Sequence, residues 1–596
     1  MSSVPDRGEI REEYKWDLAD LFADDEEWED AFESASERIA DLEAYEGRVG
    51  EDAETLLAAL ECREEVMRRV ENVSSYARMR RDENTADQQA QAMADRASAL
   101  ASRASSAASY IEPELQALDR EELDALMDAE SGLEQYDHYF DETLRMKPHT
   151  RSAEVEELLA DLGEVLGAPG ESYNMLTNAD MTFPTVEDPD GEPVQVTLNN
   201  FTTLQKNPDR AFRQRVHESF YDEWETVRNT VGATYRNSVK TDVKHARIRD
   251  YDTAREAALD SANIPVEVYD TLVETVEDNL DLLHRHAELK RERLGVDTLR
   301  MWDLYTPLTE GESPTVDYEQ AKEHVVEAVA PLGEDYQRRL EAGLNSRWVD
   351  VYETKNKRSG AYSGGTYESQ PYILMNYQDD IESMFTLAHE LGHSLHTQLA
   401  SETQPYIYGD FVIFTAEVAS TVNETLLTHH LLETVEDDRF RRHVLNEYLE
   451  RFRSTLFRQT MFADFERQVH ELAEAGEPLT PDRLDDCYGD LKARYYEPAE
   501  TDERIAREWM RIPHFYNAFY VYQYSTGISA AVALADQVLS EGEPAAARYL
   551  DFLRSGSVDY PLELLRDAGV DMTQFAPIES ALATYEAYLD RFASLT

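Results

Sequence analysis

Apolar residues recur at helical intervals along almost the whole chain, and this periodicity limits the fold more than any other feature. Trp28, Phe32 and Ile39 have such spacing near the start. Helical pattern also resumes near residue 207 and dominates from residue 379 to the end. The sequence therefore predicts a mainly α-helical protein. Its first half contains predicted helices near 54–80, 86–110, 112–130 and 153–167.

Two short segments interrupt the helical pattern. Residues 181–186 and 193–198 alternate in polarity around a Pro-Asp-Gly turn, which predicts a β-hairpin. We expect it to close an N-terminal helical domain over residues 1–200, followed by a second domain over 201–596. Residues 370–377 predict a strand, preceded by a basic, Gly-rich loop over 356–366. We expect a small β-sheet there, with 370–377 as an exposed edge.

The charge balance is strongly acidic and excludes several functions. The chain has 57 basic and 122 acidic residues, a net charge of −65. Such a chain repels both nucleic-acid phosphates and anionic membranes, so neither is an expected partner. The 33 Tyr, 20 Phe and 6 Trp argue against disorder. A well-formed core under an acidic, lysine-poor surface is typical of a halophilic protein, whose self-repulsion salt screens.

Cysteine content and the N-terminal sequence predict the compartment. Cys62 and Cys487 are the only cysteines, which excludes a disulfide framework or a cysteine-rich metal site. The first residues contain no apolar segment of the secretory kind, and we find no run of about 18 apolar residues that would span a membrane. We therefore expect a cytoplasmic protein.

One motif carries metal chemistry. His389, Glu390 and His393 form the pattern H-E-x-x-H. On a helix, residues four apart share a face, so both imidazoles can reach one ion. Glu390 lies beside the first ligand and points elsewhere, where it can hold and deprotonate the attacking water.

Two glutamates downstream complete the candidate site. Catalytic zinc has three protein ligands and one open position. Glu417 lies 24 residues after His393 among apolar neighbours, where an unpaired carboxylate would be costly. Glu424 follows two helical turns later and is a candidate acceptor for a ligand imidazole N–H; a surface carboxylate is the alternative. With His389, His393, Glu417 and a water as ligands, the zinc ion has no coordination position left for His396, which is therefore interpreted as peripheral.

These residues resemble the thimet oligopeptidase and oligoendopeptidase F family of zinc metallopeptidases. The resemblance lies in His389-Glu-Leu-Gly-His393, Glu417 and Asn423-Glu424, and extends to segments 14–18, 357–362, 371–376 and 512–516. It implies a gluzincin with one Zn²⁺ per chain and a two-lobed helical body enclosing a deep substrate channel. It also implies an N-terminal oligopeptidase F domain and hydrolysis of internal bonds in short peptides.

The same family has a histidine and tyrosines that face the metal from the C-terminal region. His514 matches that histidine. The tyrosine match is not unique, and Tyr520 and Tyr522 are the predicted donors to the developing oxyanion, with Tyr516 behind them. An aromatic packing stripe is the alternative for each tyrosine.

The leading hypothesis is a zinc endopeptidase with Glu390 as general base. A strand edge beside the metal helix would pair with an extended peptide backbone. The first alternative is a zinc carboxypeptidase or dipeptidase on a similar fold. The second is a non-catalytic acidic scaffold that binds cationic partners. The sequence leaves the oligomeric state open.

Overall fold

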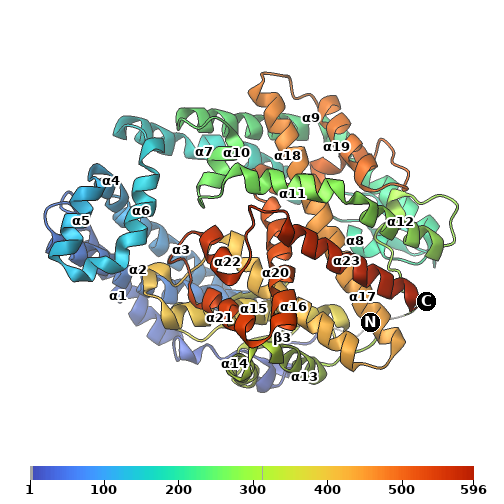
Figure 1. Ribbon diagram of the computed structural model, residues 1–596, viewed down its shortest axis with the longest axis horizontal. Coiled ribbons are helices and arrows are strands. Elements are labelled where there is room, and N and C mark those ends of the chain that lie inside the picture. Colours follow the sequence, from blue (N-terminus) through green and yellow to red (C-terminus); the bar gives the residue numbers. More distant parts are fainter. Residues whose placement is uncertain (1–3, 310, 312, 596) are drawn as a thin grey trace. The chain divides into compact units, whose positions relative to one another are not determined.

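A computed structural model describes residues 4–309, 311 and 313–595, and helices dominate it (Figure 1). Within that part of the chain, the strands form only a two-stranded and a three-stranded sheet. The prediction of a mainly helical fold with a small sheet is therefore confirmed. No described helix is long and apolar enough to cross a membrane.

The chain forms two compact units, each assembled from separate segments. Unit 1 comprises Met1–Lys147, Ser313–Thr434 and Leu534–Gly569, and unit 2 comprises Pro148–Glu312, Val435–Ala533 and Val570–Thr596. Unit 1 joins segments from both sides of residue 200, so the units group the chain by proximity rather than by that boundary. The predicted sequence domains and the two-lobed channel stay predictions.

Unit 1 contains the N-terminal helices, the larger sheet and the helix with the H-E-x-x-H motif. Its elements are α1 (Asp25–Glu43), α2 (Ala53–Glu83), α3 (Gln88–Ala108), α4 (Ile111–Ala117), α5 (Arg120–Ala129), α6 (Asp137–Arg145), α13 (Tyr318–Ala328), α14 (Glu334–Asn345), β3 (Val349–Tyr352), β4 (Tyr362–Gly364), β5 (Tyr372–Tyr377), α15 (Ile381–Thr403), α16 (Ile413–Thr434), α21 (Glu543–Arg554) and α22 (Pro561–Ala568).

Unit 2 contains the predicted hairpin and most of the C-terminal helices. Its elements are α7 (Ala153–Met175), β1 (Thr185–Glu187), β2 (Pro193–Gln195), α8 (Phe201–Gln205), α9 (Arg210–Ile248), α10 (Ala254–Asp260), α11 (Val266–Asp278), α12 (Leu280–Arg293), α17 (Asp438–Phe452), α18 (Arg458–Glu474), α19 (Pro481–Tyr495), the first part of α20 (Tyr522–Glu541) and α23 (Ala576–Ser594). Strands β1 and β2 pair antiparallel, with Val186 opposite Val194, which confirms the hairpin.

The three-stranded sheet of unit 1 has the order β3-β5-β4. Strand β5 runs parallel to β3 and antiparallel to β4, and five of its six residues are buried. The expectation that residues 370–377 form an exposed edge is therefore wrong. The edge strands are β3 and β4, and β4 lies inside the Gly-rich segment. An apolar run buried on both faces is typical of a central strand, and the pairing with β3 explains why β5 occupies that place.

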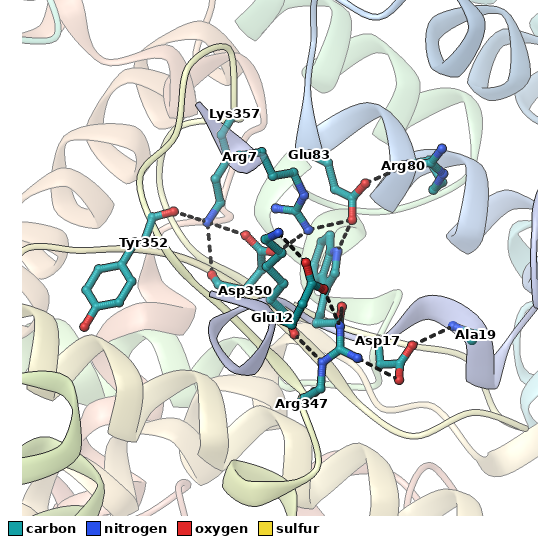
Figure 2. A network of polar contacts seen from close by, with 12 residues as sticks. Arg7, Glu12, Asp17, Ala19, Arg80, Glu83, Arg347, Asp350, Tyr352 and Lys357 are labelled. Carbon is teal, nitrogen blue, oxygen red and sulfur yellow. Dashed lines mark hydrogen bonds and ion pairs between the residues drawn. The ribbon is translucent and has the colours of Figure 1, made fainter. Parts of the chain in front are cut away.

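A buried polar network ties the Gly-rich segment to the rest of unit 1 (Figure 2). The side chain of Lys357 is 0% exposed, and its Nζ lies 2.7 Å from Asp350 Oδ1 on β3. Burial would raise the pKa of Asp350, but Arg7 and Lys357 outweigh burial and lower it. Arg358 pairs with Asp82 at 3.2 Å. Both basic residues of the segment are thus paired within the protein, and they anchor the loop that leads into β4.

Candidate metal centre

Helix α15 presents the H-E-x-x-H motif in its middle turns. Asp380 caps the helix by accepting a hydrogen bond from the backbone N–H of Ser383 at 2.7 Å. One turn separates His389 from His393, and their Nε2 atoms lie 3.2 Å apart. The helical spacing therefore brings both imidazoles to one point, as the sequence predicts.

Gly392 lets α16 approach this part of α15 closely. A Cβ atom at Gly392 would lie only 2.6 Å from the backbone oxygen of Ala419 and from Cα of Ser420. Because glycine has no Cβ, the two backbones can meet at this point. The contact sets the first turns of α16, and with them Glu417, beside the two histidines.

Three donor atoms converge at the site. Oε2 of Glu417 lies 3.4 Å from Nε2 of His389 and 3.8 Å from Nε2 of His393, and the three ligand atoms fall within 4.8 Å of one another. Ligand atoms about 2.0–2.1 Å from one tetrahedral zinc ion lie about 3.3–3.4 Å apart. The spacing and the two-nitrogen, one-carboxylate donor set therefore fit Zn²⁺.

Glu424 fixes the orientation of His389. Its side chain is 0% exposed, and Oε1 lies 2.8 Å from Nδ1 of His389. An Nδ1–H donated to this carboxylate leaves Nε2 as the lone-pair donor toward the ion. Burial would lower the pKa of His389, but Glu424 and Glu417 outweigh it and raise the pKa to about 9. The site is thus arranged to stabilise positive charge.

Glu390 is buried beside the ligands but does not belong to the converging set. It is 7% exposed, and the backbone of Ser363 on β4 favours the charged form of its carboxylate. Burial raises the pKa of Glu390 to about 7, against the lowering effect of His389. A carboxylate with a pKa near neutrality is suited to take up and release a proton. The edge strand β4 also contacts α15 one turn further on, where the hydroxyls of Ser363 and Ser394 lie 2.8 Å apart.

His396 belongs to the packing around the motif. Its ring is buried and stacks on Phe411, with ring centroids 3.6 Å apart. The geometry agrees with its interpretation as a peripheral residue.

His514 and two tyrosines form a second group, in unit 2. The rings of His514 and Tyr520 are nearly parallel, with centroids 6.2 Å apart and an interplanar angle of 14°. The hydroxyls of Tyr520 and Tyr524 are 3.5 Å apart. Tyr524, in the first turn of α20, is not among the predicted donors. Tyr520 precedes α20 by two residues, so helical spacing alone would not have grouped it with Tyr524.

The other two tyrosines considered from the sequence lie elsewhere in unit 2. Tyr522 is 3% exposed and packs on Tyr269, with ring centroids 5.1 Å apart. Tyr516 hydrogen-bonds to Thr234 at 2.7 Å and stacks on Tyr173. The structure thus brings Tyr520 to His514 and does not bring Tyr522 there. The metal-binding side chains belong to unit 1, so the two groups are described separately.

Comparison with known proteins adds to this geometry. The model of peptidase family M3 matches residues 203–584, and that of the oligopeptidase F N-terminal region matches residues 114–183. The chain belongs to peptidase family M3. Oligopeptidase PepF of Bacillus subtilis is 44% identical over 100% of this chain and 89% of its own length. Group B oligopeptidase PepB of Streptococcus agalactiae is 40% identical over 99% and 98%.

A solved structure also resembles the fold. Oligoendopeptidase-F from Enterococcus faecium has a TM-score of 0.75 and 39% identity, covering 96% of this chain and 99% of its own. Membership of the family makes this chain a metallopeptidase that acts on peptides. The alternative of a non-catalytic acidic scaffold is therefore wrong.

Proposed function

We propose that this chain is a zinc-dependent endopeptidase that hydrolyses internal bonds of short peptides. The observation that carries the proposal is the convergence of His389, His393 and Glu417 next to the buried carboxyl group of Glu390. The relatives named oligopeptidase and oligoendopeptidase support peptide substrates. The acidic, lysine-poor surface supports a cytoplasmic enzyme in a saline cell.

The donor set supports zinc as the metal, one ion per chain. His389, His393 and Glu417 would hold it, and Glu424 would orient His389. Zn²⁺, when bound, acts as a Lewis acid on the scissile carbonyl and lowers the pKa of the attacking water.

Glu390 carries the proton through the reaction. Its carboxylate accepts a proton from the attacking water as the water oxygen bonds to the carbonyl carbon. The same group then gives that proton to the amine nitrogen as the C–N bond breaks. The backbone of Ser363 favours the charged carboxylate and so supports its role as proton acceptor.

Two further groups would bind the peptide and the developing charge. Strand β4 pairs with β5 along one side only, and its other side has no strand partner among the described residues. An extended peptide added there would be held through its backbone, which suits substrates of varied sequence. His514 and Tyr520 would donate hydrogen bonds to the oxyanion.

Glu390→Gln tests the general base. Gln has nearly the same shape but cannot accept the proton, so we expect one zinc per chain and a kcat lowered by about 10²–10⁴-fold. Zinc is measured by atomic absorption and kcat with a quenched peptide. Glu382→Gln, at an exposed position in the first turn of the same helix, is the matched control. A near-native kcat for Glu390→Gln would exclude Glu390 as the base.

A further inference from the structure

A strained residue lies between His514 and Tyr520. Phe519 has a backbone φ of +59° and is buried. The left-handed region is unfavourable for a bulky aromatic residue, because Cβ crowds the backbone there. Such a residue persists only where its surroundings hold it, and strain of this kind concentrates at functional sites. The turn over residues 517–521, called the 517–521 turn below, therefore needs an external restraint.

Glu466 on α18 supplies that restraint. Its side chain is 0% exposed, and Oε1 accepts a hydrogen bond from the backbone N–H of Phe519 at 3.0 Å. Without this bond, a buried backbone donor would lose its partner. The ring of His470, one turn further along α18, packs on the Phe519 ring with centroids 4.5 Å apart. Both contacts act on the one strained residue.

A carboxyl group is a costly choice at this position. Among the described residues, Oε2 of Glu466 has no hydrogen-bond partner. Burial, with a smaller contribution from nearby Asp242, raises the pKa of Glu466 well above its ordinary value and so favours the neutral acid. An apolar side chain would fill this space at lower cost. In the part of the chain that the structure describes, the one hydrogen bond of this carboxyl group is the one it accepts from the backbone N–H of Phe519.

The 517–521 turn connects the two members of the proposed oxyanion pair. Asn517 N–H bonds back to the carbonyl of His514 at 2.9 Å, and Tyr520 follows Phe519 directly. The backbone direction at Phe519 therefore decides where the Tyr520 ring lies relative to His514. We propose that Glu466 is a positioning residue that holds Tyr520 against His514 by fixing the amide of Phe519. This inference rests on the proposed function for the role of that pair.

Substitutions at Glu466 separate positioning from packing. Glu466→Gln retains an acceptor oxygen, so kcat should stay within threefold of wild type. Glu466→Met keeps the volume and removes the acceptor. We expect kcat to fall by about tenfold or more, with KM within twofold, because a small misplacement of a catalytic group is costly. If the Met variant does not fold, Glu466→Asp takes its place, because its shorter side chain withdraws the acceptor and predicts the same loss.

Thr460→Val is the matched control. Thr460 is buried on the same helix, and its hydroxyl lies 3.1 Å from that of Ser525 on α20. Its loss breaks a polar contact between α18 and α20 without touching the 517–521 turn, so kcat should remain near wild type. Amide hydrogen exchange of residues 512–522, measured without and with zinc, should be faster in Glu466→Met than in Glu466→Gln or Thr460→Val.

A double-variant cycle provides the decisive readout. Because Glu466 acts through Tyr520, Glu466→Met should add less than threefold to the loss of kcat in Tyr520→Phe. The positioning role would be overturned if the fold-losses of kcat in Glu466→Met and Tyr520→Phe multiplied in the double variant. A wild-type kcat in Glu466→Met alone would overturn it as well. Wild-type kcat in both Tyr520→Phe and His514→Ala would refute the proposed oxyanion pair. The hydrogen-exchange comparison would then test only whether Glu466 holds the 517–521 turn.

Discussion

At the residue scale, buried ionisable groups are used in two different ways. Around the metal centre, Glu424 and Glu417 raise the pKa of His389 and favour a cation. In unit 2, Lys290, Glu450 and Arg453 form a buried ionic cluster that includes none of the residues proposed for metal binding or catalysis. The first arrangement stabilises an incoming cation. The second pairs its own charges internally and contributes to the pH dependence of stability.

Lys290 gives a pH prediction. Burial lowers its pKa to about 8, against the raising effect of Glu450. The unfolded value is about 10.4, so between these values the unfolded chain holds more protons and stability rises with pH. Relative to Lys290→Met, the wild type should gain up to about 3 kcal/mol of unfolding free energy between pH 8 and 10.5.

Urea unfolding at constant salt measures that difference. Lys322→Met serves as a control, because Lys322 pairs with the exposed carboxylate of Glu319. A wild-type minus Lys290→Met difference that is constant across this pH range would contradict the account.

At the element scale, the close approach of α16 to α15 at Gly392 places Glu417 beside the two histidine ligands. Gly392→Ala forces the helices apart, since its Cβ would meet backbone atoms at 2.6 Å. We expect a loss of about 1–3 kcal/mol in stability. Displacement of Glu417 should also weaken zinc binding by about 10-fold or more. Thermal unfolding and zinc titration measure the two effects.

Gly163→Ala on α7 is the matched control, because nothing lies within 4 Å of the added Cβ. Alanine is the better helix former, so that variant should keep wild-type zinc affinity and gain slight stability. Equal zinc affinity in Gly392→Ala and wild type would show that the close helix contact does not determine the ligand geometry.

The sequence predicted local features better than long-range pairing. The i, i+4 spacing of His389 and His393 predicts their common face, because that geometry is intrinsic to a helix. Strand β5 could not be assigned to the centre of its sheet, since that depends on pairing with β3, more than twenty residues earlier. Likewise, Lys357 is buried against Asp350 on β3, and the basic, Gly-rich segment around Lys357 does not by itself reveal that distant partner. The φ of Phe519 leaves no sequence pattern at all.

At the scale of the whole molecule, the net charge of −65 governs stability in solution. Screening lengths fall from about 10 Å at 0.1 M salt to about 3 Å at 1 M, so salt relieves the repulsion among surface carboxylates. The midpoint of thermal unfolding, followed by circular dichroism, should rise steadily with KCl from 0.1 to 2 M. Sucrose at equal osmolality is the control. A midpoint independent of KCl would argue against a halophilic protein.

Cleavage of an end-blocked, internally quenched peptide of about eight residues in high-salt buffer tests the central claim most directly. Blocked ends exclude the carboxypeptidase and dipeptidase alternative, because those enzymes need a free terminus. The account predicts internal cleavage, seen by mass spectrometry, that a chelator abolishes and zinc restores. A folded, zinc-loaded protein that leaves this peptide intact but trims an unblocked one would contradict it.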